Sequence, residues 1–428
     1  MIAYKYVLTC ATLLFLAACS QPDSNMTPNA NPFFSESELY LQYPAYDLIE
    51  DAHFAPAFER GMEIQLEEIK AITSNKEPAT FENTLVAMQR SGQMLSRVSR
   101  VFSGMTSAHT NETLESIRAE MAPKRAAHSD AIGLNPVLFE RIKSVFDSRD
   151  SVAYDPESRR LIEETYKDFV RAGANLSADE KSSLMAFNSE LASLQTSFSQ
   201  NVLNEVNDKA IVVDSADELA GLTEGQIAKA AEAATARDME GKFVIPLLNS
   251  SGQPVLGSLQ NRALRERIYR TSISRGNSGG AYDNKENISR IARIRADRAK
   301  LLGFDNHAAL GLSNQTAQTT QAVNELLAIL APPAVRNAKR EAADLQRMID
   351  SEGGNFDLAP WDWAFYTEKV RKDRFDFDAS ELKPYLEMNN VLENGVFYAA
   401  EMVFGITFKE RTDLPVYQED VRVWEVFD

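Results

Sequence analysis

Residues 177–202 read SADEKSSLMAFNSELASLQTSFSQNV, and this segment gives the strongest indication of the fold class. Ser177 and Glu180 stand at the serine-x-x-glutamate spacing of a capping box, which marks a helix N-terminus. A stripe of apolar residues then recurs every three or four positions: Leu184, Phe187, Leu191, Leu194, Phe198 and Val202. Such a stripe is typical of a long helix that buries one face in a core. The segment therefore predicts a long amphipathic helix and a mainly α protein.

The same helical periodicity extends from about residue 44 along most of the chain. An earlier stripe places Phe54, Phe58, Met62, Leu66 and Ile69 on one expected face. Asp155 followed by Pro156 predicts another helix start, because proline is favoured at the first helical position. Two further helices are expected over residues 261–269 (NRALRERIY) and within residues 282–304, the latter ending in KLLGF with Gly303 as a C-terminal cap.

Two short runs interrupt the helices and predict strands. Residues 210–213 (AIVV) and 242–247 (KFVIPL) are rich in β-branched residues, and a capped helix is expected between them at Thr223-x-x-Gln226. We expect them to form a small antiparallel ribbon. The turn-rich residues 249–254 (NSSGQP) then mark a domain boundary. Residues 421–427 (VRVWEVF) predict a last strand with no following partner, so we expect the 428 residues to be the front part of a longer protein.

Composition excludes several classes of protein. The chain carries a formal net charge of −17, which disfavours nucleic-acid binding. Its two cysteines, Cys10 and Cys19, both stand at the front, so the body has no disulfide framework and no cysteine metal site. With 44% hydrophobic residues, the chain can build a sizeable core.

Residues 1–18 have the pattern of a signal peptide, with Lys5 before a short apolar run. The run ends in LAAC at residues 16–19, which resembles the lipobox of bacterial lipoproteins, whose cysteine becomes the acylated first residue. An ordinary cleavage site with an incidental cysteine is the alternative. The polar residues 20–31 favour the lipobox, and Ser20 after the cysteine implies the outer membrane by the sorting rule of such lipoproteins. We therefore expect lipidation at Cys19, a polar tether over residues 19–38 and a periplasm-facing location in the cell envelope.

The sequence offers little recognisable chemistry. It has no His-Glu-x-x-His and no Gly-x-Ser-x-Gly, and its four histidines are His53, His109, His128 and His307. The glycine-rich residues 276–280 (GNSGG) lack the ending of a phosphate loop and indicate a flexible connection.

Two charged or aromatic segments have competing interpretations. The arginines of residues 261–269 could hold a carboxylate or phosphate, but a solvated helix face is the favoured interpretation. Residues 360–366 (PWDWAFY) could line a groove with Asp362 as a polar group. We favour instead an amphipathic helix start whose tryptophans, Trp361 and Trp363, fill the core.

Motifs in order along the chain resemble the N-terminal part of a bacterial peptidyl-dipeptidase of the thimet oligopeptidase family of zinc metallopeptidases. The resemblance covers residues 38–428 and rests on these segments: 80–84 (TFENT), 127–132 (AHSDAI), 171–176 (RAGANL), 261–262 (NR), 282–284 (YDN), 301–307 (LLGFDNH), 360–363 (PWDW), 414–417 (LPVY) and 421–427 (VRVWEVF).

The resemblance implies a helical, two-lobed, channel-type fold that admits short unstructured peptides, truncated here before the zinc motif. It divides the body into an N-terminal lobe, residues 39–255, and the beginning of the catalytic domain, residues 256–428. It implies zinc for the full-length protein and release of C-terminal dipeptides from oligopeptides, but no catalytic or metal residue of the family falls within this chain. This chain alone is therefore expected to be inactive. The alternative is a noncatalytic peptide-binding or scaffold lipoprotein of the envelope, and the oligomeric state stays open.

Overall fold

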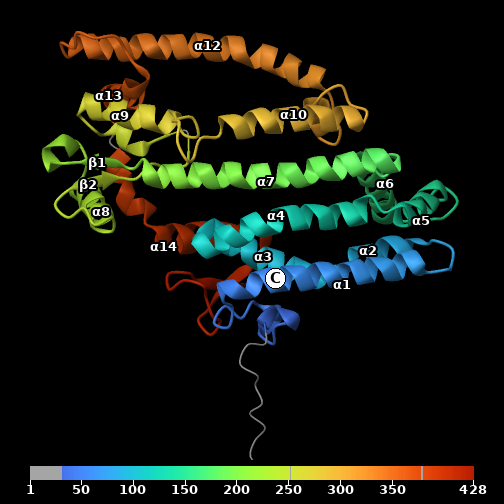
Figure 1. The fold of residues 1–428 in the computed structure, drawn as a ribbon. Helices are drawn as coiled ribbons and strands as arrows, with labels where there is room; N and C mark the ends of the chain where they lie inside the picture. The colour runs from blue at the N-terminus through green and yellow to red at the C-terminus, as the bar shows by residue number, and fades with distance from the viewer. Residues whose placement is uncertain (1–30, 251, 377–378) are drawn as a thin grey trace, which may run out of the picture.

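The computed structural model describes residues 31–250, 252–376 and 379–428 (Figure 1). Helices dominate it, as the sequence predicts, and the strands form two small antiparallel sheets. The α-helices are α1 Phe54–Ser74, α2 Ala87–Gln89, α3 Gln93–Ala108, α4 Glu112–Gly133, α5 Pro136–Asp147, α6 Pro156–Ala172, α7 Ala178–Asp208, α8 Glu224–Thr235, α9 Arg262–Ile273, α10 Lys285–Leu301, α11 His307–Leu312, α12 Thr320–Ser351, α13 Trp363–Phe375, α14 Met388–Val391 and α15 Tyr398–Phe404. The strands are β1 Ile211–Val213, β2 Phe243–Ile245, β3 Thr407–Arg411 and β4 Val423–Phe427.

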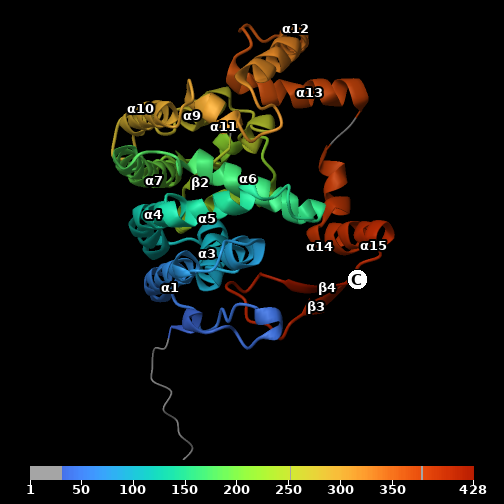
Figure 2. The ribbon, with the colours of Figure 1, turned by 90° about the vertical axis from the view of Figure 1, so that its right-hand side faces the viewer.

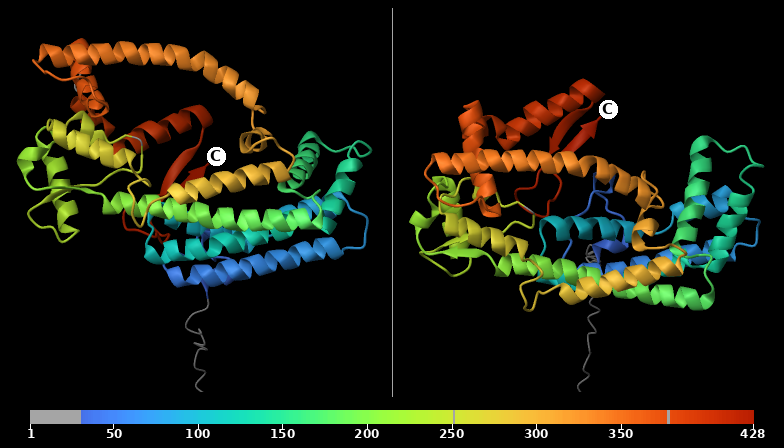
Figure 3. Two further views of the ribbon diagram at one scale, coloured as in Figure 1. Left: turned by 45° about the horizontal axis from the view of Figure 1, so that its top comes forward. Right: turned by 90° about the horizontal axis from the view of Figure 1, so that it is seen from above.

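The long helices are stacked. In Figure 1, α1, α4, α7 and α10 run side by side, and α4 packs on α1 and α7 while α10 packs on α7. Figure 2 shows that α13, α14, α15 and the β3–β4 sheet form a second column facing this stack. Seen from above in Figure 3, α5 and α6 project from one end of the stack, toward the side on which the C-terminal strands lie. Within the described residues, no helix is both long and apolar enough to cross a bilayer.

The predicted face of α1 is buried except at one position. Phe54 and Phe58 are fully buried and contact the Phe102 ring, with centroids 5.1 and 5.2 Å away. Leu66 is 39% exposed, so its assignment to the core is wrong. Because an α-helix has about 3.6 residues per turn, three successive four-residue steps from Phe54 rotate Leu66 about 120° away from the starting direction.

The capping box of α7 is confirmed. The Glu180 amide donates to the Ser177 hydroxyl at 3.4 Å, and the Ser177 amide donates to Oε2 of Glu180 at 2.9 Å. Leu184 and Leu191 are buried, and Leu191 packs against Ile294 of α10. The stripe of α7 therefore forms the seam between α7 and α10, as its periodicity predicts.

The predicted ribbon is confirmed as β1 paired antiparallel with β2, with Val212 opposite Val244. Its buried residues share one core with Leu256 and Leu264, on the other side of the expected boundary at residue 255. The division into two domains stays a prediction.

The last strand has a partner, so the expectation of an unpaired strand is wrong. β4 pairs antiparallel with the preceding β3, and Glu410 lies opposite Trp424. The Phe397 ring stacks on Phe408 and meets Trp424 edge-on, at centroid distances of 4.1 and 4.7 Å. The partner was missed because β3 is a short charged run, TFKER, without the alternation that marks a strand.

The N-terminal segment packs on the helical body and on this sheet. Phe33 is buried beside Phe54, with ring centroids 5.3 Å apart, and Tyr46 lies edge-on to Tyr417 at 5.4 Å. The last part of the expected tether, residues 31–38, is thus attached to the body. Cys19 and residues 19–30 lie outside the described residues.

The glycine-rich loop after α9 is not a free connection, which corrects the interpretation from sequence. Glu205 of α7, only 2% exposed, accepts hydrogen bonds from the Gly276 amide and the Ser278 hydroxyl. Asn284 is fully buried, and its amide donates to the Gly276 carbonyl at 2.8 Å. A buried carboxylate on a distant helix therefore fixes the loop.

Candidate functional site

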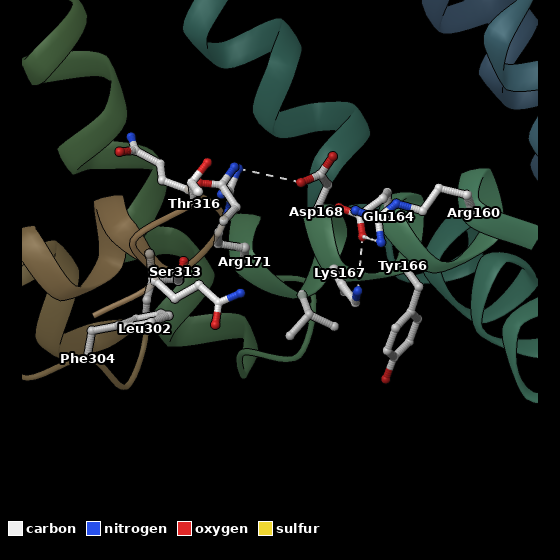
Figure 4. Close-up of a pocket in the computed structure, with 14 residues that line it drawn as sticks. Arg160, Glu164, Tyr166, Lys167, Asp168, Arg171, Leu302, Phe304, Ser313 and Thr316 are labelled. Atoms are coloured by element: carbon white, nitrogen blue, oxygen red, sulfur yellow. Dashed lines mark hydrogen bonds and ion pairs between the residues drawn. The ribbon is translucent and has the colours of Figure 1, made fainter. Parts of the chain in front are cut away.

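A pocket of about 690 Å³ opens between α6 and the segment that joins α10 to α12 (Figure 4). We call it the α6 pocket. One side carries charged residues of α6, and the other carries Leu302, Phe304 and polar residues around residues 313–318. Because α6 and the opposite side are about 130 residues apart in sequence, the pocket exists only in the folded chain.

The charged groups of the α6 pocket are paired with one another. Oε1 of Glu164 lies 3.3 Å from Nη1 of Arg160 and 2.9 Å from Nζ of Lys167. Nη2 of Arg171 lies 3.4 Å from Oδ1 of Asp168. The hydrogen bond from Lys167 is the main cause that holds the pKa of Glu164 below its usual value. Glu164 is therefore ionised at neutral pH, and these pairs suit binding rather than proton transfer.

The opposite side offers amide and hydroxyl groups beside an apolar surface. Asn314, Gln315 and Thr316 can each donate and accept hydrogen bonds, while Leu302 and Phe304 are apolar. An extended peptide has the matching chemistry, since its backbone donates and accepts and its side chains are often apolar. The α6 pocket is therefore a candidate peptide-binding site.

The arginine helix α9 holds a carboxylate, so the favoured interpretation of a solvated face is wrong for two of its arginines. Arg265 is 1% exposed, and its Nη2 donates to Oδ1 of Asp362 at 2.8 Å. Arg262 donates from Nη2 to Oδ2 of Asp362 at 2.8 Å. Burial disfavours the charge on Asp362, but the bonds from both arginines outweigh burial and lower its pKa. The motif NR at residues 261–262 and the motif PWDW thus meet in one buried ion cluster.

The tryptophans of this cluster do not fill the core, which corrects their favoured assignment. Trp363 is 36% exposed, and Trp361 is half-buried with Arg270 over its ring, 4.8 Å from the centroid. Asp362 and Tyr366 are the buried residues of this segment. The one-turn 3-10 helix η7, Pro360–Asp362, directs Asp362 inward, while Trp363 is exposed and Trp361 is half-buried with its indole nitrogen covered.

Each of the four histidines has its own contacts. Nδ1 of His53 accepts from the Glu50 amide, Nε2 of His128 lies 2.7 Å from Oε1 of Gln65, His109 lies near the Tyr417 ring, and His307 borders a second pocket. Across residues 31–250, 252–376 and 379–428, no group of three or more His, Cys, Asp or Glu side chains is arranged to hold a metal ion.

The α6 pocket was missed at the sequence level. Its one local signal is the run SNQTAQTTQ at residues 313–321, which is unusually rich in amides and hydroxyls. The charged residues of α6 resemble any solvated helix face, because each has an oppositely charged neighbour three or four positions away.

Comparison with known proteins shows which sequences this chain resembles. Residues 255–428 match Peptidase family M3. The chain is 42% identical over 398 residues, 93% of its length, to the dipeptidyl carboxypeptidase of Escherichia coli strain K12. Residues 255–428 belong to peptidase family M3. The resemblance drawn from the ordered motifs is thus confirmed.

Two further relatives are also peptidases of similar sequence. The dipeptidyl carboxypeptidase of Salmonella typhimurium is 42% identical over 400 residues, and oligopeptidase A of Escherichia coli is 28% identical over 402 residues. The chain spans 58% of the length of the Escherichia coli dipeptidyl carboxypeptidase and 59% of the Salmonella protein. The higher identity is to the dipeptidyl carboxypeptidases, in agreement with the branch that the motifs favour.

Proposed function

We propose that this chain is part of a zinc peptidyl-dipeptidase that releases C-terminal dipeptides from oligopeptides. The 42% identity to a dipeptidyl carboxypeptidase along 93% of the chain carries the proposal. In it, these residues supply helical wall and peptide contacts, and the zinc site belongs to the part of the relatives that this chain does not span. The α6 pocket would contact the peptide.

Exposed apolar surface supports this proposal. The first part of α12 exposes Leu326, Leu327, Ile329 and Leu330, with Ile329 70% exposed. A helix that carries large apolar residues in contact with water is poorly stable in isolation, because helices in proteins depend on packing. A similar exposure occurs on α15, where Phe404 is 72% exposed. Contiguous apolar surface of this kind marks an interface, and further chain of the same protein would cover it.

Zinc content and hydrolysis test the proposal directly. The purified chain from residue 19 onward should carry no stoichiometric zinc and release no dipeptide from an N-blocked tripeptide. The Escherichia coli dipeptidyl carboxypeptidase, assayed in parallel, should carry zinc, release the dipeptide and lose this activity with a chelator. Stoichiometric zinc with chelator-sensitive hydrolysis by this chain alone would refute the assignment of the zinc site to other residues.

A second candidate function is noncatalytic peptide binding by an envelope lipoprotein, and the peptide-like chemistry of the α6 pocket favours it. Sequencing the DNA downstream of the Asp428 codon separates the two. An in-frame continuation that contains His-Glu-x-x-His and a later glutamate supports the peptidase. A stop codon at that place supports the binding protein.

We further propose that Cys19 carries a lipid that anchors the protein in the outer membrane, with its body in the periplasm. The residues around Cys19 support this proposal through their likeness to a lipobox. Cells fed radiolabelled palmitate should label the wild-type protein and the Cys10→Ser variant equally, and should not label Cys19→Ser. Labelling of Cys19→Ser would contradict the anchor.

A further inference from the structure

A second pocket, of about 260 Å³, lies where α7, α10 and the start of α11 meet. We call it the α7–α10 pocket. Its polar lining consists of Asn188, Gln195, Arg295, Arg298 and His307. The lining contains two arginines and a histidine but no carboxylate, in a chain whose formal net charge is −17.

Arg298 is held in place by an amide rather than by an acid. Its Nε donates to Oδ1 of Asn188 at 2.9 Å, and Nδ2 of Asn188 donates to Oδ1 of Asp130 at 2.7 Å. This relay fixes the plane of the guanidinium and leaves its two terminal nitrogens without a hydrogen-bond partner among the described residues. Burial raises the pKa of Asp130, whose charge acts on Arg298 from behind Asn188 and outside the pocket lining.

Arg295 adds a second positive charge at the same place, while His307 is a neutral imidazole beside the two arginines at neutral pH. Arg295 stands three positions before Arg298 on α10, so both project from neighbouring positions of one helix face. Arg295 makes no ion pair or hydrogen bond with any residue that the structure describes. Burial lowers the pKa of His307, and the charges of Arg295 and Arg298 lower it further. Arg171, which borders the α6 pocket, also acts on Arg298 as a like charge.

Two arginines that converge on a pocket with no carboxylate in its lining repel each other, and an anion bound between them would relieve this repulsion. A guanidinium fork matches the two oxygens of a carboxylate or phosphate, and two forks on one helix face can hold one such group. We propose that the α7–α10 pocket binds a small anion, either a carboxylate or an inorganic oxoanion such as phosphate. The inference is independent of the proposed peptidase activity, because it rests on this chain's own residues.

Calorimetric titration of the chain from residue 19 onward, at constant ionic strength, tests the site. The probes are inorganic phosphate, N-acetylalanine and, as a neutral control, N-acetylalanine amide. Arg295→Gln is the informative variant, because Arg295 has no protein partner to lose. Arg293→Gln is its matched control, since Arg293 is an exposed arginine on the same helix outside the pocket lining.

We expect saturable one-site binding of at least one anion and none of the neutral amide. Arg295→Gln should weaken that binding about tenfold, or about 1.4 kcal/mol, and Arg293→Gln should change it less than about twofold. Binding of phosphate alone identifies an inorganic oxoanion as the ligand, and binding of N-acetylalanine alone identifies a carboxylate. Absence of saturable binding by both anions, or equal weakening by the two variants, would overturn the proposal.

Discussion

Replacing Asp362 with asparagine should strongly destabilise the contact between α9 and α13. Asp362 is fully buried and accepts hydrogen bonds from Arg262, from Arg265 and from the Ala359 amide. Asparagine has nearly the same shape, but it removes the negative charge and turns an NH₂ group toward arginines that can only donate. The Arg265 charge would then remain buried without a counter-charge.

The exposure of each arginine sets the magnitude. The Arg265 side chain is 2% exposed, whereas that of Arg262 is 36% exposed and can recover water. Breaking a buried ion pair by removing one partner costs about 3–5 kcal/mol, while a partly exposed pair contributes about 1 kcal/mol or less. Arg265 also donates to the Leu259 and Gln260 carbonyls, which hold it in place after the substitution. We therefore expect a loss of about 3–5 kcal/mol in the free energy of unfolding.

Urea unfolding followed by tryptophan fluorescence measures this loss, because two of the three tryptophans, Trp361 and Trp363, flank Asp362. Asp373→Asn is the matched control. Asp373 lies on α13 and is exposed, so the control should change stability by about 0.5 kcal/mol or less. A loss below about 1 kcal/mol for Asp362→Asn would refute the view that this carboxylate compensates a buried charge.

The pH dependence of stability should report the same group. The pKa of Asp362 in the folded chain is below its ordinary value of 3.8, so the folded state favours the ionised form. The carboxylate therefore stabilises the fold fully above that ordinary value, and this contribution is lost as the pH falls through the folded pKa. The difference in unfolding free energy between wild type and Asp362→Asn should shrink as the pH falls below about 3.8.

Two further predictions concern the loop after α9 and the N-terminal core. Glu205→Ala removes the acceptor of the Gly276 amide, so trypsin should cut after Arg275 faster than in wild type. Glu190→Ala removes an exposed ion pair of the same helix and should leave the cleavage rate unchanged. Ile142→Ala, at a fully buried position of α5, should lower the unfolding free energy by about 2–5 kcal/mol in a urea titration. Val137 is 50% exposed on the same helix, so Val137→Ala should change the unfolding free energy by about 0.5 kcal/mol or less.

Local signals predicted the helices well. Ser177 and Thr223 each cap a helix as expected, since a capping box needs only two residues three positions apart. Asp155 caps α6, with Pro156 at its first position, for the same local reason. The ribbon of β1 and β2 was also predictable, because both strands are short runs of β-branched residues that need a partner close by.

The charged and aromatic residues were predicted less well. Arg265 and Asp362 are 97 positions apart, and nothing local shows that either is buried. Trp363 was assigned to the core from its size, but the direction of η7 gives the inward position to Asp362. In the same way, the loop at Gly276 reads as flexible until Glu205 is known to lie beneath it.

The sequence by itself determined the helical class, the helix starts and, through motifs in a fixed order, the likeness to peptidase family M3. These depend on residues within a few positions of each other or on the order of segments, both of which are readable along the chain. Only the tertiary structure decided which charges are buried, which indoles reach water, and which groups meet in the α6 and α7–α10 pockets. The physical reason is that many packings satisfy the same apolar stripes, and only the packing adopted fixes the distances between side chains far apart in sequence.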